Sequence, residues 1–183
     1  QIQQNFGVTS FSQFLGAEMI AEKYDFSKDA LDRYAFATTQ KAIAAINAGH
    51  FDNEILPLQE RIKDMPPGDQ LHAIDEGVRF NASLEAINGL KVLQDGGRLT
   101  AGTASQICDG ASGVMVVNAA GLKALGVEPL ARIHHLSVIG HDPVIMLEAP
   151  IPATERALKM AGMGIDDIDL FEVNEAFASV PLA

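Results

Sequence analysis

Residues 166–178 read Asp-Asp-Ile-Asp-Leu-Phe-Glu-Val-Asn-Glu-Ala-Phe-Ala, and this stretch decides the predicted fold. It combines a short acidic turn, an apolar strand over 170–173, and an Asn-Glu pair where the strand gives way to a helix. Ligands of α/β folds usually bind just beyond the carboxyl ends of the strands. Asn174 therefore has two compatible interpretations: its amide can serve a developing oxyanion in a dry site, or the residue can cap the following helix.

The residues before this stretch also predict an α/β pattern. The run 113–117 is continuously apolar, as in a strand covered on both faces, and 130–139 alternates loosely as a second strand. Helices are predicted at 121–125 and at 152–161, the second ending at Gly162. Because a strand, a helix and a strand follow one another, a right-handed parallel crossover is expected.

The first half of the chain has a different character. Residues 1–50 are predicted to be helical, with a capping box at Ser10-Phe11-Ser12-Gln13 and a second helix capped by Ser27. Residues 51–97 are expected to be rich in loops, with a turn at Met65-Pro66-Pro67-Gly68-Asp69 that no helix crosses.

Composition excludes several classes of function. The 183 residues are 48% hydrophobic and carry a formal net charge of −11, which argues against nucleic acid or an anionic membrane surface as partner. A single cysteine suits a reducing compartment, and we predict a cytoplasmic protein. Five histidines show no metal-ligand spacing, so no metal site is predicted. The chain begins with Gln1, and both of its ends are expected to lie inside a longer protein.

Residues 100–110 read Thr-Ala-Gly-Thr-Ala-Ser-Gln-Ile-Cys-Asp-Gly and are a second candidate for ligand binding. Small residues let a backbone approach a ligand closely, and the hydroxyl of Thr103 or Ser105 can hydrogen-bond it. Without the spacing of a phosphate-binding loop, a tight loop leading into a strand is the favoured interpretation. Cys108 is expected to be a small buried residue.

Basic side chains are few in this acidic chain, and three of them lie close together in sequence. Arg79, Lys91 and Arg98 can meet the phosphates of a nucleotide-like ligand, or they can be solvated surface charges.

Taken together, these stretches resemble the thiolase family, the acetyl-CoA acetyltransferases and 3-ketoacyl-CoA thiolases. The resemblance covers nearly the whole chain. Six blocks carry it in order: Gly-His-Phe-Asp-Asn-Glu-Ile at 49–55, Asp-Glu-Gly-Val-Arg at 75–79, residues 100–110, Pro-Leu-Ala-Arg-Ile at 129–133, Ala-Pro-Ile-Pro-Ala-Thr at 149–154, and Val-Asn-Glu-Ala-Phe-Ala at 173–178.

The resemblance implies a partial thiolase-like α/β fold, in which a helical and loop-rich insertion precedes strand and βαβ elements of two similar halves. Residues 1–97 would be the loop domain that covers coenzyme A. Residues 98–120 would hold the last strand of the N-terminal half, and 121–183 would begin the C-terminal half.

The resemblance also implies the site. Asn174 matches the family asparagine that orients the water of an oxyanion hole. Ser105 matches a serine that contacts the pantetheine arm of coenzyme A, with Ala101, Gly102 and Phe177 lining the same channel. Arg79 matches a basic residue near the nucleotide end.

The implied activity is that of an acyl-CoA acyltransferase, which cleaves or condenses 3-ketoacyl-CoA through an acyl-cysteine. Acyl-CoA is then a substrate, no bound cofactor is expected, and the whole protein is expected to be a homodimer or homotetramer.

The family's nucleophilic cysteine would lie before Gln1, and its catalytic His and second Cys beyond Ala183. The chain alone is therefore predicted to be inactive and to self-associate through exposed apolar faces. The alternative is a non-catalytic thiolase-like protein that binds acyl-CoA or lipid, in which His would usually replace Asn174.

Overall fold

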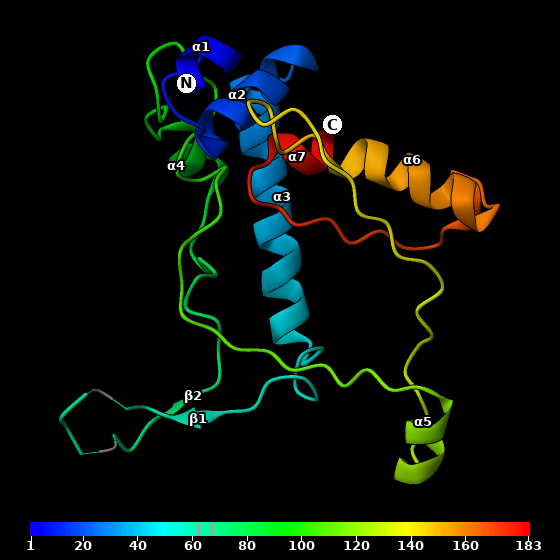
Figure 1. The fold of residues 1–183 in the computed structure, drawn as a ribbon. Coiled ribbons are helices and arrows are strands. Elements are labelled where there is room, and N and C mark those ends of the chain that lie inside the picture. Colours follow the sequence, from blue (N-terminus) through cyan, green and yellow to red (C-terminus); the bar gives the residue numbers. More distant parts are fainter. Residues whose placement is uncertain (62, 67) are drawn as a thin grey trace.

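The computed structural model describes residues 1–61, 63–66 and 68–183. Helix α3 is the longest element, with α1, α2, α4 and α7 around its N-terminal end (Figure 1). The β hairpin and α5 lie apart from its other end, on opposite sides of it in this view. In order, the elements are α1 (Ile2–Phe6), α2 (Gln13–Lys23), α3 (Lys28–Asn47), β1 (Leu58–Gln59), β2 (Leu71–His72), α4 (Leu84–Asn88), α5 (Ala119–Leu125), α6 (Pro150–Ala161), the 3-10 helix η1 (Ile165–Asp167) and α7 (Ser179–Leu182).

The helical prediction for residues 1–50 is confirmed, with one correction at the start of α2. The hydroxyl of Ser27 accepts a hydrogen bond from Ala30 N at 3.1 Å and caps α3 as expected. The capping box at Ser10 is wrong, because α2 begins at Gln13 and its cap is Ser12. Ser12 has an extended backbone, and its Oγ accepts from Leu15 N, the third residue of the helix.

The only sheet among the described residues is the hairpin of β1 and β2. These strands are antiparallel, with Leu58 opposite His72 and Gln59 opposite Leu71. The predicted turn at 65–69 falls between them, although Pro67 lies outside the described residues.

The core is small and joins segments that are far apart in the sequence. It consists of six buried residues, from α2, α3, the segment after α4 and the end of the chain: Ala17, Ala21, Leu31, Leu99, Phe177 and Ala178. Alanines on α2 let α7 pack closely, and the hydroxyl of Ser179 donates to Ala17 O at 3.0 Å.

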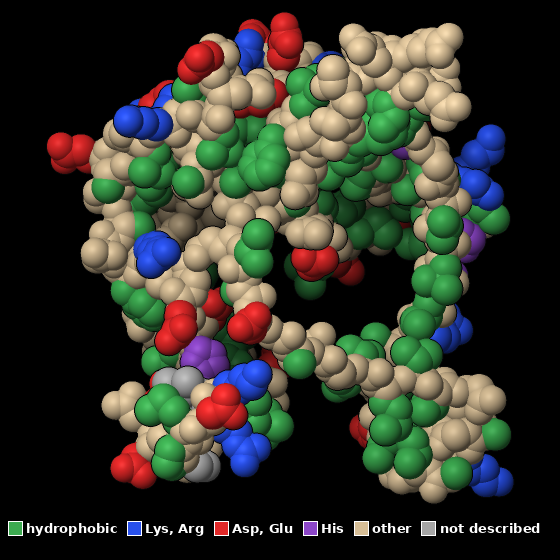
Figure 2. All heavy atoms as spheres, turned by 60° about the vertical axis from the view of Figure 1, so that its left-hand side comes forward, with side chains coloured by type: hydrophobic (Ala, Val, Ile, Leu, Met, Phe, Trp, Pro, Cys, Tyr) green, Lys and Arg blue, Asp and Glu red, His purple; other side chains and the backbone are tan. Residues whose placement is uncertain are grey.

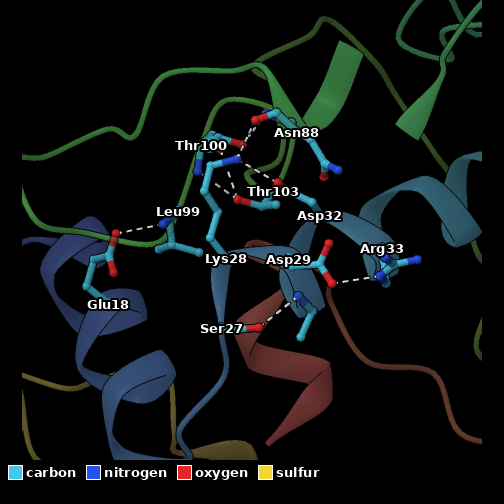
Figure 3. Close-up of polar contacts among 12 residues, drawn as sticks. Glu18, Ser27, Lys28, Asp29, Asp32, Arg33, Asn88, Leu99, Thr100 and Thr103 are labelled. Carbon is cyan, nitrogen blue, oxygen red and sulfur yellow. Dashed lines mark hydrogen bonds and ion pairs between the residues drawn. The ribbon is translucent and has the colours of Figure 1, made fainter. Parts of the chain in front are cut away.

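A buried carboxylate ties residues 98–99 to α2. Glu18 is 8% exposed, and its oxygens accept a hydrogen bond from Arg98 N at 2.9 Å. They also accept one from Leu99 N at 2.8 Å (Figure 3). The Arg98 side chain strengthens the connection, since its Nη1 donates to Ala21 O and Phe26 O at 2.7 and 2.9 Å. Arg98 is thus a structural residue, and the prediction that it meets ligand phosphates is not supported by its contacts.

A second connection holds residues 141–149 against α2. A side chain at Gly16 would put its Cβ 2.7 Å from Ile145 O, so only glycine permits this approach. Nearby, Glu148 accepts hydrogen bonds from the Lys23 ammonium and from the Tyr24 hydroxyl, the latter at 2.6 Å. His141 Nε2 lies 3.5 Å from the same carboxylate.

The two helices predicted for residues 121–125 and 152–161 are confirmed. The prediction at 121–125 corresponds to α5, which Asn118 caps through Gly121 N at 2.9 Å. The prediction at 152–161 corresponds to α6, which has proline in its first turn and ends at Gly162 in the left-handed conformation.

The predicted strands at 113–117, 130–139 and 170–173 are wrong as elements of this structure. All three segments lack helix and strand, and most of their apolar side chains face solvent: Val114 and Leu170 are both 89% exposed. Figure 2 shows hydrophobic side chains at the surface of the arch that these segments form around an open space. A strand is stabilised by hydrogen bonds to a neighbouring strand, and no backbone ladder joins these segments to other described residues. The expected parallel crossover is consequently absent from the described part of the chain.

The role of Glu18 predicts a large effect of its removal. Glu18→Ala would leave the buried amides of Arg98 and Leu99 without an acceptor and should lower the free energy of unfolding by about 3 kcal/mol. Glu22→Ala, on the exposed side of the same helix, is the matched control and should change it by less than ~0.5 kcal/mol. Chemical denaturation of the two variants measures the difference, and equal effects would show that the Glu18 bonds do not support the fold.

The contacts of Glu148 predict a pH dependence of stability. Its hydrogen bonds to Lys23 and Tyr24 lower the pKa of the Glu148 carboxyl below its ordinary value of about 4.3. The carboxylate therefore contributes stability above about pH 5, and this contribution is lost as the pH falls through the lowered pKa. The difference in melting temperature between the wild type and Glu148→Gln should shrink between pH 6 and pH 3. A difference that is constant over this range would contradict the prediction.

Candidate functional site

A cleft of about 870 Å³ lies between α3, the segment 75–90 and the segment 101–108. Its volume is within the range of small-molecule sites, which is roughly 300–1,000 Å³. Four of the six predicted site residues line it: Arg79, Ala101, Gly102 and Ser105.

A tight turn presents the small residues of the cleft. Thr100 and Thr103 are buried and bond to one another: Thr100 N donates to Thr103 Oγ1 at 2.8 Å, and this hydroxyl donates to Thr100 O at 3.1 Å (Figure 3). Ala101 and Gly102 are held between them. A Cβ on Gly102 would lie 2.8 Å from Leu90 Cδ1, so glycine here allows close packing against the segment after α4. The tight loop predicted for this stretch is confirmed and lines a cleft, but the strand expected to follow it is absent from the described residues.

The end of the chain forms the neighbouring wall. Ala104 and Phe177 form an isolated antiparallel bridge, in which Ser105 N donates to Ala176 O and Ala178 N donates to Thr103 O, both at 2.9 Å. Phe177 is 2% exposed and packs edge-on against Phe14, with ring centroids 5.3 Å apart. Phe177 thus belongs to the core beneath the cleft and not to its lining.

Asn174 lies on the exposed segment that leads into this bridge. The helix-cap interpretation is wrong, because α7 begins only at Ser179 and its N-cap is Ala178. Asn174 does not line the cleft, whereas its neighbour Glu175 does. The two residues of the Asn-Glu pair therefore differ in their surroundings.

Sequence reasoning missed the polar cluster around Glu175. The Tyr34 hydroxyl donates to the Glu175 carboxylate, and Thr38 Oγ1 lies 3.3 and 3.4 Å from its two oxygens. Burial first, and then the hydrogen bond to Glu175, raise the pKa of Tyr34 to about 12, so this hydroxyl remains a donor. We call Tyr34, Thr38 and Glu175 the Glu175 cluster. Tyr34 and Thr38 are four residues apart in α3, and this spacing places two hydroxyls on one face of the helix.

Arg79 brings positive charge to the opposite segment of the cleft lining. It is exposed, and no salt bridge joins it to another described residue. Its loop is shaped by Asp75 Oδ1, which accepts from Gly77 N at 2.8 Å, and by Gln106 Nε2, which donates to Gly77 O at 2.7 Å. The second bond joins the Arg79 loop to the segment 101–108. Lys91, the third basic candidate, does not line the cleft.

Cys108 also lines the cleft and is exposed, so the expectation that it is buried is wrong. It lies in the extended part of residues 106–117, where few side chains cover it. No group of three or more metal-ligating side chains comes together among the described residues. None of the described helices is both long enough and apolar enough to cross a membrane.

Comparison with known proteins shows the family to which the chain belongs. The sequence matches the thiolase N-terminal domain over residues 8–120 and the thiolase C-terminal domain over residues 127–183. It is 47% identical over 178 residues to the steroid 3-ketoacyl-CoA thiolase FadA6 of Mycobacterium tuberculosis, covering 97% of this chain and 42% of that protein. The chain spans less than half the length of the curated relatives it matches.

Solved structures give the same result at the level of fold. The acetyl-CoA acetyltransferase of Bacillus anthracis matches with a TM-score of 0.84 and 32% identity, over 96% of this chain and 44% of that one. The human mitochondrial 3-ketoacyl-CoA thiolase in complex with CoA matches with a TM-score of 0.79 and 37% identity, over 92% and 41% of the two chains. The predicted fold class, a partial α/β thiolase-like fold, is confirmed by these neighbours even though its predicted strands are unpaired here. With one thiolase domain matching well over half of its residues, the chain belongs to the thiolase family.

Proposed function

We propose that these residues supply the coenzyme A site of a thiolase-type acyl-CoA acyltransferase, which cleaves or condenses 3-ketoacyl-CoA through an acyl-cysteine. The observation that carries the proposal is the cleft. Arg79 from one segment and Ala101, Gly102 and Ser105 from another line the same cavity, although about twenty residues separate them in the sequence.

The chemistry of these residues suits the two ends of coenzyme A. Arg79 is a guanidinium without a salt-bridge partner among the described residues, and a phosphate group would supply one. The turn at Ala101 and Gly102 leaves room for the narrow pantetheine arm. The backbone amide of Ser105 is bonded to Ala176 O, which holds the residue at the cleft while its hydroxyl has no hydrogen bond to another described residue.

We assign Asn174 to the oxyanion hole, where a fixed amide orients the water that faces the developing negative charge. Acyl transfer of this type also needs a cysteine nucleophile and a second cysteine as the proton-transfer base. These 183 residues contain one cysteine, Cys108, whose motif fits neither role. They are therefore proposed to bind coenzyme A without turning over.

The remaining parts of the proposal follow the family resemblance. Residues 1–97 act as the domain that covers coenzyme A, residues 98–120 end the N-terminal half, and residues 121–183 begin the C-terminal half. The active protein is a cytoplasmic homodimer or homotetramer, and its substrate is an acyl-CoA. The single cysteine supports the cytoplasmic assignment, and the exposed apolar residues of the arch support assembly.

Coenzyme A binding tests the role of the cleft. Isothermal titration of the chain with coenzyme A should show saturable binding, and Arg79→Ala should weaken it about tenfold because one charge-assisted phosphate contact is lost. Arg132→Ala is the matched control, since Arg132 is an exposed arginine outside the cleft, and it should leave the affinity unchanged. Absence of binding, or equal effects of the two substitutions, would overturn the assignment of the cleft.

A thiolysis assay tests the proposed lack of turnover. We expect no loss of acetoacetyl-CoA above background when coenzyme A and the chain are added, because the second cysteine is missing. Intact mass spectrometry must show that the protein assayed is the 183-residue chain. Turnover that survives Cys108→Ser would refute the proposed mechanism, and turnover abolished by that substitution would make Cys108 the nucleophile.

A further inference from the structure

The segment before α7 is extended, and it is held from two directions. Figure 1 shows the chain running from α6 towards α3 as an extended trace before it reaches α7. Its backbone is held at 176–178 by the hydrogen bonds to Thr103 and Ser105. Its side chain at Glu175 is held by two hydroxyls of α3, from Tyr34 and Thr38.

The hydrogen bonds from Tyr34 and Thr38 to Glu175 have no evident role in building the core. Glu175 is exposed, Tyr34 and Thr38 are half-buried, and all three line the cleft. No salt bridge joins Glu175 to another described residue, so its charge is met by neutral donors alone. Such a carboxylate gains more from its hydrogen bonds than from Coulomb attraction, and its position depends on where the two hydroxyls lie.

The geometry of an extended chain links this carboxylate to its neighbour. Successive side chains of an extended segment point to opposite faces. With Glu175 directed towards α3, the side chain of Asn174 is presented on the other face, which agrees with its absence from the cleft lining. A rotation of the segment that released Glu175 would also turn Asn174.

We propose that Glu175 is a positioning residue, and that its hydrogen bonds to Tyr34 and Thr38 fix the face on which Asn174 is presented. The inference rests on the proposed function, because it is the oxyanion role of Asn174 that gives its orientation a consequence. Tyr34 and Thr38 act through Glu175 and are positioning residues as well. Helix α3 therefore contributes in two ways. It forms a wall of the cleft, and its hydroxyls fix the orientation of the segment that carries Asn174.

Spin labelling at position 174 tests this proposal without any ligand. Cys108 is the only cysteine, so a chain carrying Cys108→Ser and Asn174→Cys takes a single nitroxide label at the position of interest. The mobility of the label is then read from its electron paramagnetic resonance spectrum. Tyr34→Phe should shorten the rotational correlation time of the label about threefold, because local order is lost when a tether is removed.

Two substitutions of Glu175 separate hydrogen bonding from packing. Glu175→Gln keeps an oxygen that accepts from both hydroxyls and should leave the label nearly as immobile as in the parent chain. Glu175→Leu has a similar size but no acceptor, and should mobilise the label as Tyr34→Phe does. If Tyr34→Phe fails to fold, this pair still decides the question.

Tyr24→Phe is the matched control, since Tyr24 also donates its hydroxyl to a carboxylate, that of Glu148, but far from position 174 in sequence and outside the cleft. It should leave the label unchanged. The proposal is overturned if Glu175→Leu leaves the label immobile, if Glu175→Gln mobilises it as much as Glu175→Leu, or if Tyr24→Phe has the same effect. A chain that fails to bind coenzyme A would refute the proposed function alone, because the label reports the segment in the absence of ligand.

Discussion

The buried carboxylate of Glu18 is the constraint on which the rest of the structure depends. It accepts the backbone amides of Arg98 and Leu99 and so holds the start of the cleft turn against α2. Leu99 is thereby kept in the core, and Thr100 and Thr103 close the turn that presents Ala101 and Gly102. Burying a carboxylate without hydrogen-bond donors is unfavourable in free energy. Helix α2 and residues 98–99 therefore stabilise each other.

The cleft follows from that arrangement. Residues 103–105 are held in place by the turn, and they in turn bind residues 176–178 through two backbone hydrogen bonds. The end of the chain then lies beside α3, where Glu175 meets Tyr34 and Thr38. Helix α3, residues 103–105 and residues 175–178 are far apart in the sequence and thus meet at the cleft.

The differences between prediction and structure have a common physical origin. Helices α2, α3, α5 and α6 were predictable because a helix satisfies its own hydrogen bonds, and Ser27 before α3 and Gly162 after α6 mark helix ends in the sequence. The apolar runs at 113–117 and 170–173 have the composition of strands, but a strand requires a neighbour that the described residues do not provide. Cys108 is exposed for the same reason, since residues 106–117 pair with no strand among the described residues.

The sequence by itself determined the family and the helices from α2 to α6 that its caps and periodicity mark, because caps, periodicity and motif order are local properties of the chain. Only the tertiary structure decided which of those residues come together. It placed Arg79 and Ser105 in one cleft, withdrew Phe177 into the core, and gave Glu175 two hydroxyl partners from a helix about 140 residues away. Such contacts depend on how distant segments pack, and no local pattern in the sequence records them.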